Sequence, residues 1–521
     1  MKTLRLLIAA ALTLALLPSV ASASSRQESM FQDDPRLVTA PEATMKATLD
    51  ELKALGVDRI RVSLFWYLVA PSSTSATKPS FDSSNPAAYG PGKWDRYDRL
   101  LVAAKQRGIL VNLNVTSPLP RWGSTAVSPR ADVQKTYSPD PVEFGRFVAA
   151  AGRRYSGTFN GLPRVNYWSI YNEPNQAGWL TPQWKPDPRN GGRLVEAAPD
   201  IYRALVRTSH QALGATGHGA DTLLIGETAP KGLRRRKGLT KSIDALRFLR
   251  SLYCLDRNRQ RYRDSTARVH GCPATAAQFV AQNPALFKAS GYGHHPYELY
   301  LSPERKPRVK DWVTIANLPR LSFELKSIYR RYKQRTQTRR GVPLYLTEYG
   351  YQTPPDPLGV PFSRHAAYIS QAEQISYRNP LVRAMSQFLL VDDAPFPGVT
   401  NRRLAYRTFQ SGLRRLNGKR KPAYRAYATP LFLNKTRLRR GQRTSVFGLL
   451  RAASPGKRVR AKIQFRAKGA KRWRTRKTVT ARGSRKYVRA RVSLPRSGSV
   501  RLRWRNAGKT VLSRSVTVRI R

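Results

Sequence analysis

The chain has 521 residues, which is too long for one small domain, so two or three domains are expected. Hydrophobic residues make up 40% of it, enough for a sizeable core, which excludes a globally disordered protein. The formal net charge is +63, from 94 basic and 31 acidic residues. A surface this basic is expected to attract polyanions.

The positive charge is densest in the last part of the chain. Residues 430–521 hold 30 Lys and Arg and no Asp or Glu, whereas the rest holds 64 basic and 31 acidic residues. We expect this part to meet an anionic polymer of the cell envelope or an anionic polysaccharide. Nucleic acid is not the expected partner, because the chain has the features of an exported protein.

Those features lie at the N-terminus, where residues 1–23 are typical of a secretory signal peptide. Lys2 and Arg5 precede an apolar run over 6–17, and Ala21-Ser22-Ala23 is a small-residue cleavage site. A retained anchor is the alternative, and the cleavage site argues against it. No later segment is as apolar, so we expect a secreted protein that can associate with the cell wall and has no membrane span after signal removal.

The two cysteines, Cys254 and Cys272, are separated by a short loop. In an exported chain such a pair is expected to form a disulfide. Two thiols alone make a poor metal site.

Helices and strands alternate along most of the chain, judged by hydrophobic period and by proline and glycine near their ends. Helices are expected at 41–56, 93–108, 141–155, 200–213, 321–335 and 364–376. Strands are expected at 36–39, 58–66, 109–115, from 165, at 222–227, 291–297, 342–348 and 382–391. About eight repeats in roughly 400 residues predict a (β/α)8 TIM barrel with insertions over 24–429. A doubly wound sheet is the rival, but no Gly-rich turn follows the first strand.

The pattern changes after the boundary near 427–433. Short runs of alternating apolar and basic residues at 459–465, 487–494 and 500–504 are typical of period-two strands. Residues 430–521 are therefore predicted to form a small, strongly basic, Ig-like β-sandwich.

Two of the barrel strands end on a glutamate. Asn172-Glu173-Pro174 follows an apolar, aromatic run, and Pro174 cannot continue a central strand. Glu348 ends a second apolar run, and Gly350 then allows a sharp turn. Carboxylates at the carboxyl ends of barrel strands lie where barrel enzymes do their chemistry. A facing pair of this kind suits hydrolysis of a glycosidic bond.

From about 30 to 428 the chain resembles the clan A retaining glycoside hydrolases, most nearly the cellulase-like family 5 and its β-xylosidase-like relatives. The resemblance implies that Glu173, after Asn172, is the acid/base and that Glu348 is the nucleophile. It further implies that Arg61, on the second strand, supports the nucleophile and that His295 and Tyr297 meet the site. One departure is that the last strand lacks the tryptophan of many clan members; Gln387 or Phe388 is expected in its place.

The same resemblance implies a role for each of these residues. Glu348 would be ionised and attack the anomeric carbon, with Arg61 and Tyr297 orienting it. Glu173 would be protonated and donate to the leaving oxygen, and Asn172 would bind the sugar 2-hydroxyl. Glu227 also ends a strand and competes for the part of second carboxylate; we rank it lower and leave open whether it lines the sugar site.

Sugar faces pack on aromatic rings, and four tryptophans follow strand ends: Trp66, Trp122, Trp179 and Trp184. As a set they favour an elongated cleft, although loop packing explains any one of them equally well. His294 and His295 could be a buried pair or metal ligands, but no carboxylate at ligand spacing accompanies them, so no metal or other cofactor is expected.

The substrate class is therefore a poly- or oligosaccharide. The alternative is a non-catalytic carbohydrate- or wall-binding protein, which the presence of both glutamates disfavours. A nucleic-acid role for the tail would use Trp473, Tyr487 and Trp504, which their alternating pattern makes more suitable as core residues.

Overall fold

The computed structural model describes residues 27–233, 236–453, 458–483 and 485–521. The expected signal peptide lies outside the described residues. Among the described helices, none combines the length and the apolar character needed to cross a bilayer.

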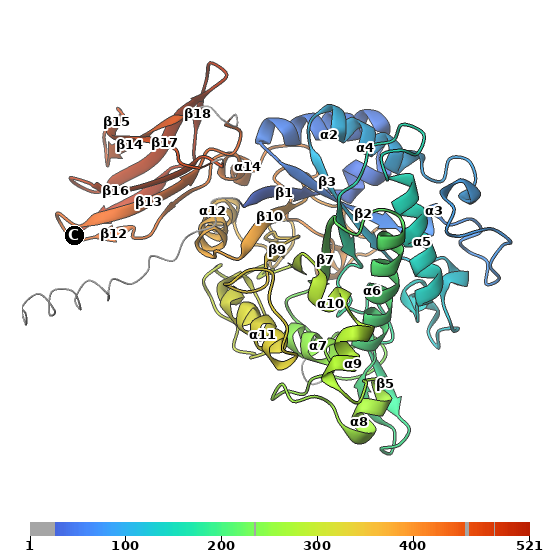
Figure 1. Ribbon diagram of the computed structural model, residues 1–521. Coiled ribbons are helices and arrows are strands. Elements are labelled where there is room, and N and C mark those ends of the chain that lie inside the picture. Colours follow the sequence, from blue (N-terminus) through green and yellow to red (C-terminus); the bar gives the residue numbers. More distant parts are fainter. Residues whose placement is uncertain (1–26, 234–235, 454–457, 484) are drawn as a thin grey trace, which may run out of the picture.

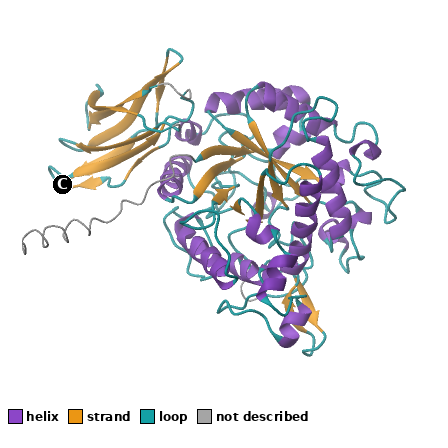
Figure 2. Ribbon diagram, viewed as in Figure 1, coloured by secondary structure: helices purple, strands orange, loops and turns teal. Residues whose placement is uncertain are grey.

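Eight parallel strands close into a barrel, as predicted (Figures 1 and 2). Around the ring the order is β1-β10-β9-β8-β7-β4-β3-β2, and β1 pairs with both β10 and β2. The bounds are β1 Glu28–Gln32, β2 Arg59–Phe65, β3 Leu110–Thr116, β4 Tyr167–Ile170, β7 Thr222–Thr228, β8 Gly291–His294, β9 Leu344–Leu346 and β10 Val382–Phe388.

Helices surround the ring. The long ones are α2 Glu42–Leu55, α4 Asp95–Gln106, α5 Pro141–Arg154, α6 Ala198–Ala215, α11 Leu318–Arg331 and α12 Phe362–Arg378. Helix α5 shows why they form where the sequence predicts them. Asp140 caps it by accepting hydrogen bonds from the N–H groups of Val142 and Glu143, and Pro141 suits the first turn. Phe144, Phe147 and Val148 are buried at helical spacing.

Shorter elements fill the connections. They are the helices η2 Pro35–Thr39, α3 Trp66–Val69, η3 Pro86–Tyr89, η4 Arg121–Gly123, η5 Ala131–Thr136, η6 Ile315–Asn317, α13 Arg402–Ala405 and α14 Pro422–Ala428.

The first strand is not where the sequence predicted it. Residues 36–39, expected as a strand, belong to the short helix η2, and the strand that closes the ring is β1. Pro35 explains this, because its fixed φ suits a helical first turn and it has no N–H for a ladder. The buried Asp33 carboxylate accepts a hydrogen bond from the Arg36 N–H at 3.1 Å, which favours the helical turn.

Two segments leave the barrel: the one after β4 holds a hairpin, and the excursion after β7 holds four short helices. These are β5 Trp184–Asp187 with β6 Arg193–Glu196, and α7 Ala245–Leu252, α8 Asp264–Val269, α9 Ala276–Gln282 and α10 Ala285–Lys288. A disulfide joins Cys254 to Cys272 across 18 residues of this excursion.

The C-terminal part has two sheets that enclose a separate apolar core. One sheet has the order β11-β13-β16 and the other β12-β19-β17-β14-β15, with β18 beside β17. The bounds are β11 Leu431–Leu433, β12 Arg437–Leu438, β13 Arg443–Leu449, β14 Arg460–Ala467, β15 Arg474–Thr480, β16 Tyr487–Ser493, β17 Gly498–Asn506, β18 Lys509–Leu512 and β19 Val516–Ile520. The predicted β region is thus present, and its Ig-like character stays a prediction.

This β region packs on the barrel through α12 (Figure 1). Tyr377 of α12 lies against Phe447 and Tyr487, with ring centroids 5.2 and 4.1 Å away. Beside them Arg451 is buried and donates to Glu373 Oε2 at 2.6 Å and to the Tyr427 carbonyl at 2.9 Å. The contact is therefore apolar with one enclosed ion pair.

Candidate active site

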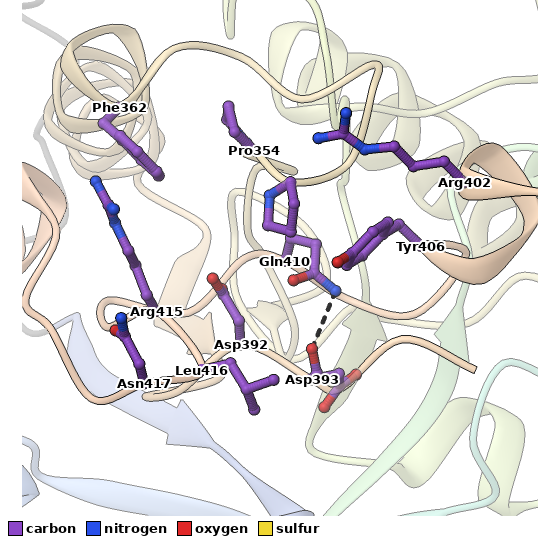
Figure 3. A pocket seen from close by; sticks show the side chains of 11 residues that line it. Pro354, Phe362, Asp392, Asp393, Arg402, Tyr406, Gln410, Arg415, Leu416 and Asn417 are labelled. Atoms are coloured by element: carbon purple, nitrogen blue, oxygen red, sulfur yellow. Dashed lines mark hydrogen bonds between the residues drawn. The ribbon is translucent and has the colours of Figure 1, made fainter. Parts of the chain in front are cut away.

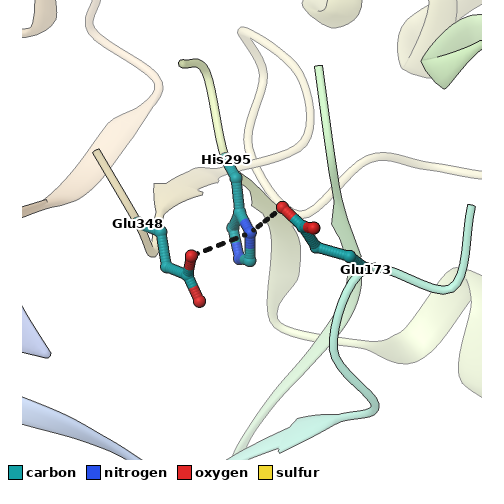
Figure 4. Close-up of side chains that lie close together, drawn as sticks. All are labelled: Glu173, His295 and Glu348. Atoms are coloured by element: carbon teal, nitrogen blue, oxygen red, sulfur yellow. Dashed lines mark hydrogen bonds and ion pairs between the residues drawn. The ribbon is translucent and has the colours of Figure 1, made fainter. Parts of the chain in front are cut away.

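The carboxyl ends of the barrel strands bring the sequence-predicted site residues together. Arg61 lies within β2, Glu173 follows β4, His295 follows β8 and Glu348 follows β9. One oxygen each of Glu173 and Glu348 and one nitrogen of His295 lie within 4.8 Å of one another. Figure 4 shows the imidazole between the two carboxylates.

A strained turn places Glu173 at the end of β4. Tyr171 and Glu173 have positive φ angles of 64° and 36°, which non-glycine residues seldom adopt. Backbone hydrogen bonds hold the turn: Asn172 N–H donates to Thr116 Oγ1 at 3.0 Å, and Glu173 N–H to the Glu227 carbonyl at 3.0 Å. The side chain of Glu173 keeps 18% exposure, so it faces the open end of the barrel.

Glu348 is held by donors on two sides. Arg61 Nη1 donates to its Oε1 at 2.8 Å, and the Tyr297 hydroxyl donates to its Oε2 at 3.0 Å. Burial raises the pKa of Glu348, while the charges of His295 and Arg61 act in the opposite direction. One face of this carboxylate is thus fixed, and its side chain is 8% exposed.

Arg61 is fully buried and touches three further side chains. It donates to Gln32 Oε1 at 2.6 Å and to Asn172 Oδ1 at 2.7 Å, and lies 3.2 Å from Glu227 Oε2. Burial alone would lower its pKa, but the charges of Glu227 and Glu348 outweigh burial and raise it. Gln32 was missed from the sequence because β1 was expected elsewhere.

Glu227 lies in the barrel interior rather than at its open end. It is fully buried, and its Oε2 lies 3.0 Å from His295 Nε2 and accepts the Thr347 hydroxyl at 2.5 Å. Burial works to raise the pKa of Glu227, but Arg61 and His295 overcome this and lower it to about 2. The carboxylate is therefore ionised at neutral pH and acts on His295 from behind.

His295 bridges all three carboxylates. Its Nδ1 lies 2.8 Å from Glu173 Oε1 and 3.5 Å from Glu348 Oε2, and its Nε2 contacts Glu227. Burial would lower its pKa, but these negative charges raise it to about 9. A protonated imidazole has no lone pair for a metal. His295 is therefore better suited to act as a positively charged hydrogen-bond donor than as a metal ligand.

His294, which the sequence left as a possible partner of His295, points elsewhere. Its ring nitrogens lie 2.9 Å from Thr228 Oγ1 and 3.0 Å from the Val313 carbonyl oxygen. Burial lowers the pKa of His294 to about 3, so it is neutral.

Three of the four tryptophans are packed into the fold, contrary to the expectation of a sugar-binding set. Trp66 is fully buried, Trp122 packs on it edge to face at 5.6 Å, and Trp184 donates to the Lys241 carbonyl at 2.6 Å. An aromatic at a strand end can turn toward the helices as easily as toward the open end of the barrel, and Trp66 does so, stacking on Phe147 of α5. Only Trp179, just after the Glu173 turn, stays partly exposed.

Of Gln387 and Phe388, which the sequence offered in place of the clan tryptophan, Phe388 is the one that lies beside Tyr297. Phe388 is partly exposed and packs on Tyr297 and Phe409, with centroids 6.3 and 4.9 Å away. Gln387 is buried and donates to the Ser411 carbonyl. Phe409 had no sequence signal, since it lies in a loop 21 residues after the end of β10.

A hollow of about 530 Å³ opens in the loops that follow β9 and β10, on the same end of the barrel (Figure 3). Its lining includes Asp392, whose Oδ1 accepts from the buried Lys421 at 2.6 Å. Burial raises the pKa of Asp392 to about 6 and lowers that of Lys421 to about 8. The remaining lining residues are Pro354, Pro355, Phe362, Asp393, Arg402, Tyr406, Gln410, Arg415, Leu416 and Asn417.

No protein-family model and no curated protein matches this chain. Among solved structures it is similar to a family 39 glycoside hydrolase from Bacteroides cellulosilyticus WH2, with 13% identity, a TM-score of 0.46 and coverage of 92% of this chain and 83% of that one. A GH39 enzyme from Xanthomonas axonopodis pv. citri has 15% identity and a TM-score of 0.48, with coverage of 92% of this chain and 94% of that one. A GH5_18 enzyme from Streptomyces cattleya, solved with GlcNAc, has 17% identity and a TM-score of 0.46, with coverage of 78% of this chain and 80% of that one. These three structural neighbours are glycoside hydrolases of families 39 and 5.

Proposed function

We propose that this protein is a secreted retaining β-glycosidase acting on a poly- or oligosaccharide. The observation that carries the proposal is the approach of Glu173 and Glu348 to within 4.8 Å at the open end of the barrel. Carboxyl groups about 5 Å apart suit a double displacement, because a wider gap is needed to fit an attacking water between acid and base.

In the first step a Glu348 oxygen attacks the anomeric carbon while the bond to the leaving oxygen breaks. Glu173 gives its proton to that oxygen, and an ester between Glu348 and the sugar remains. Arg61 and Tyr297 fix the attacking carboxylate, which limits the orientational entropy lost on reaction.

In the second step Glu173, now ionised, takes a proton from water. The water oxygen attacks the anomeric carbon, the ester bond breaks, and Glu348 returns as a carboxylate. Asn172 contributes to both steps. Arg61 occupies its Oδ1 at 2.7 Å, which leaves the amide N–H₂ as the donor for the sugar 2-hydroxyl.

The proposal is tested with aryl β-glycosides and a 2-deoxy-2-fluoro aryl glycoside. We expect wild type to turn over the first and to be trapped by the second, with the added mass on the peptide containing Glu348. Glu348→Gln should lose roughly 10⁴-fold in kcat, because the nucleophile is gone. Glu304→Gln, at an exposed site, is the control. Sugar binding without turnover by wild type would instead support a binding protein.

We further propose that residues 24–429 are the catalytic part and that 430–521 hold the enzyme on an anionic polymer of the cell envelope. Export is supported by the disulfide between Cys254 and Cys272, since such bonds persist in oxidising compartments. Mass spectrometry of the N-terminus after expression in an exporting host tests it, with Ser24 expected as the first residue.

A further inference from the structure

The larger sheet of the C-terminal part has one apolar and one basic face. Ala461, Ile463 and Phe465 of β14 lie in the core, and Val500, Leu502 and Trp504 of β17 join them. Because side chains alternate along a strand, the residues between them face outward. On these two strands the outward cations are Arg460, Lys462, Arg466, Arg501, Arg503 and Arg505.

A hollow of about 670 Å³ lies at one end of this basic face. Its lining residues are Arg458, Val459, Arg460, Lys462, Arg503, Trp504, Arg505, Asn506 and Ala507. The register explains its position. Lys462 opposite Arg503 is the last β14–β17 pair at this end, although β14 begins at Arg460 and β17 continues to Asn506. The hollow is therefore bounded by two strand ends that do not pair with each other, although the first pairs with β15 and the second with β18. We name it the β14–β17 groove.

The charge of this groove is not neutralised by the described parts of the chain. Like charges directly opposite on neighbouring strands destabilise a sheet, and Lys462 faces Arg503 in this way. Residues 430–521 contain no Asp or Glu. Where the barrel supplies carboxylates, cations of this region do pair, as Arg451 does with Glu373 and Arg485 with Asp58.

Within the described residues, no carboxylate lies within the 4.0 Å ion-pair distance of the five cations that line the groove. A face that is charged only for solubility usually mixes both signs over an open surface. Here one sign gathers around a hollow. An anion from outside the chain would neutralise this excess of positive charge.

We propose that the β14–β17 groove binds a polysaccharide chain that carries carboxylate groups. Four of its five cations are arginines, whose planar fork of donors matches a carboxylate with two parallel hydrogen bonds. A linear polymer with charges at intervals can meet Arg458 and Arg460 on one side and Arg503 and Arg505 on the other.

The choice of a glycan over a nucleic acid rests on the proposed glycosidase function and on the aromatic residues. Single-stranded nucleic acids are held by aromatic rings that are free to stack with bases. Trp504 is 3% exposed. Trp473, which the sequence placed in the core, is only partly buried, but it does not line the groove, and the guanidiniums of Arg466 and Arg501 lie 4.9 and 4.1 Å from its ring. The groove thus offers charge without a free stacking surface.

The test compares two double variants of the full chain for binding to polygalacturonate at 50 and 200 mM NaCl. Lys462→Gln/Arg503→Gln removes two groove cations, and Arg443→Gln/Arg491→Gln removes two exposed cations from the other sheet. We expect the groove variant to bind roughly tenfold more weakly, because charged hydrogen bonds are lost, and the control to stay within about twofold of wild type. Wild-type binding should weaken with salt.

Several results would overturn the proposal. These are equal losses in both variants, equal binding to neutral dextran, or tighter binding to duplex DNA or oligo-dT than to polygalacturonate at the same salt. Circular dichroism checks the fold, and Arg460→Gln/Arg505→Gln replaces the first pair if it unfolds. Aryl glycoside turnover is scored separately. Binding without any turnover would refute the proposed function and leave the groove standing.

Discussion

The charge balance around His295 determines how the site responds to pH. Three carboxylates face this one imidazole, and the buried Glu227 holds its far nitrogen at 3.0 Å. Since Glu227 does not reach the open end of the barrel, we regard it as a positioning residue. It keeps His295 protonated and the two other carboxylates turned toward it.

Replacing Glu227 with Gln keeps its shape and removes its charge. We expect the pKa of His295 to fall from about 9 toward its usual range, because one of the charges that raise it is lost. NMR titration of the imidazole measures this, and the alkaline limb of kcat/KM should move to lower pH. Glu298→Gln, a buried carboxylate paired with Lys231, is the control and should leave the titration unchanged. An unaltered His295 titration in Glu227→Gln would contradict the assignment.

The same group links stability to pH. Its folded pKa of about 9 exceeds the unfolded value of 6.5, so its contribution is complete below pH 6.5 and is lost as pH rises to about 9. In Glu227→Gln the loss of stability should still begin near pH 6.5, but it should be smaller and should end at a lower pH, because the folded pKa is lower. Denaturant unfolding between pH 6 and 10 measures this pH dependence of stability in both proteins.

At the scale of elements, the disulfide secures the excursion that carries α7 and α8. Its 18-residue span predicts that Cys254→Ser/Cys272→Ser lowers the free energy of unfolding by about 3 kcal/mol, chiefly through the entropy of the unfolded chain. Denaturant titration measures this. A reducing agent should destabilise wild type and leave the variant unaffected. An unchanged midpoint in the double variant would contradict a stabilising role.

The ring of alternating strands and helices could be predicted because its strands are apolar runs and its helices carry proline and glycine at their ends. The first strand could not, because Glu28–Gln32 is short and polar and is recognisable only from its pairing with β10. The positions of Glu173 and Glu348 followed from strands that end abruptly. The burial of Trp66 and the part played by Glu227 depend on side-chain direction, which residue spacing does not encode.

For the whole molecule, the contact between the barrel and the β region depends on the buried pair of Arg451 and Glu373. Arg451→Ala should cost about 3–5 kcal/mol of stability, because Glu373 would remain buried without its cation. Thermal and denaturant unfolding measure the loss. Arg443→Ala, at an exposed site, should stay within about 0.5 kcal/mol of wild type. A similarly small effect for Arg451→Ala would show that the other contacts, among them the aromatic contact and the Arg485–Asp58 ion pair, hold the two parts together without it.

The closure of the barrel by its first strand has a consequence for biosynthesis. In the β1–β10 pair Phe31 lies opposite Gln387. Arg61 contacts Glu348, which lies 287 residues further along the chain. The growing polypeptide must therefore leave the ribosome with one strand edge of β1 vacant until β10 has been translated. Vacant edges invite misassembly, and such distant pairings form slowly. We expect the nascent chain to need a chaperone that holds it unfolded. Because the barrel closes late, the chain would stay unfolded long enough to pass through a translocation pore, as the proposed export requires.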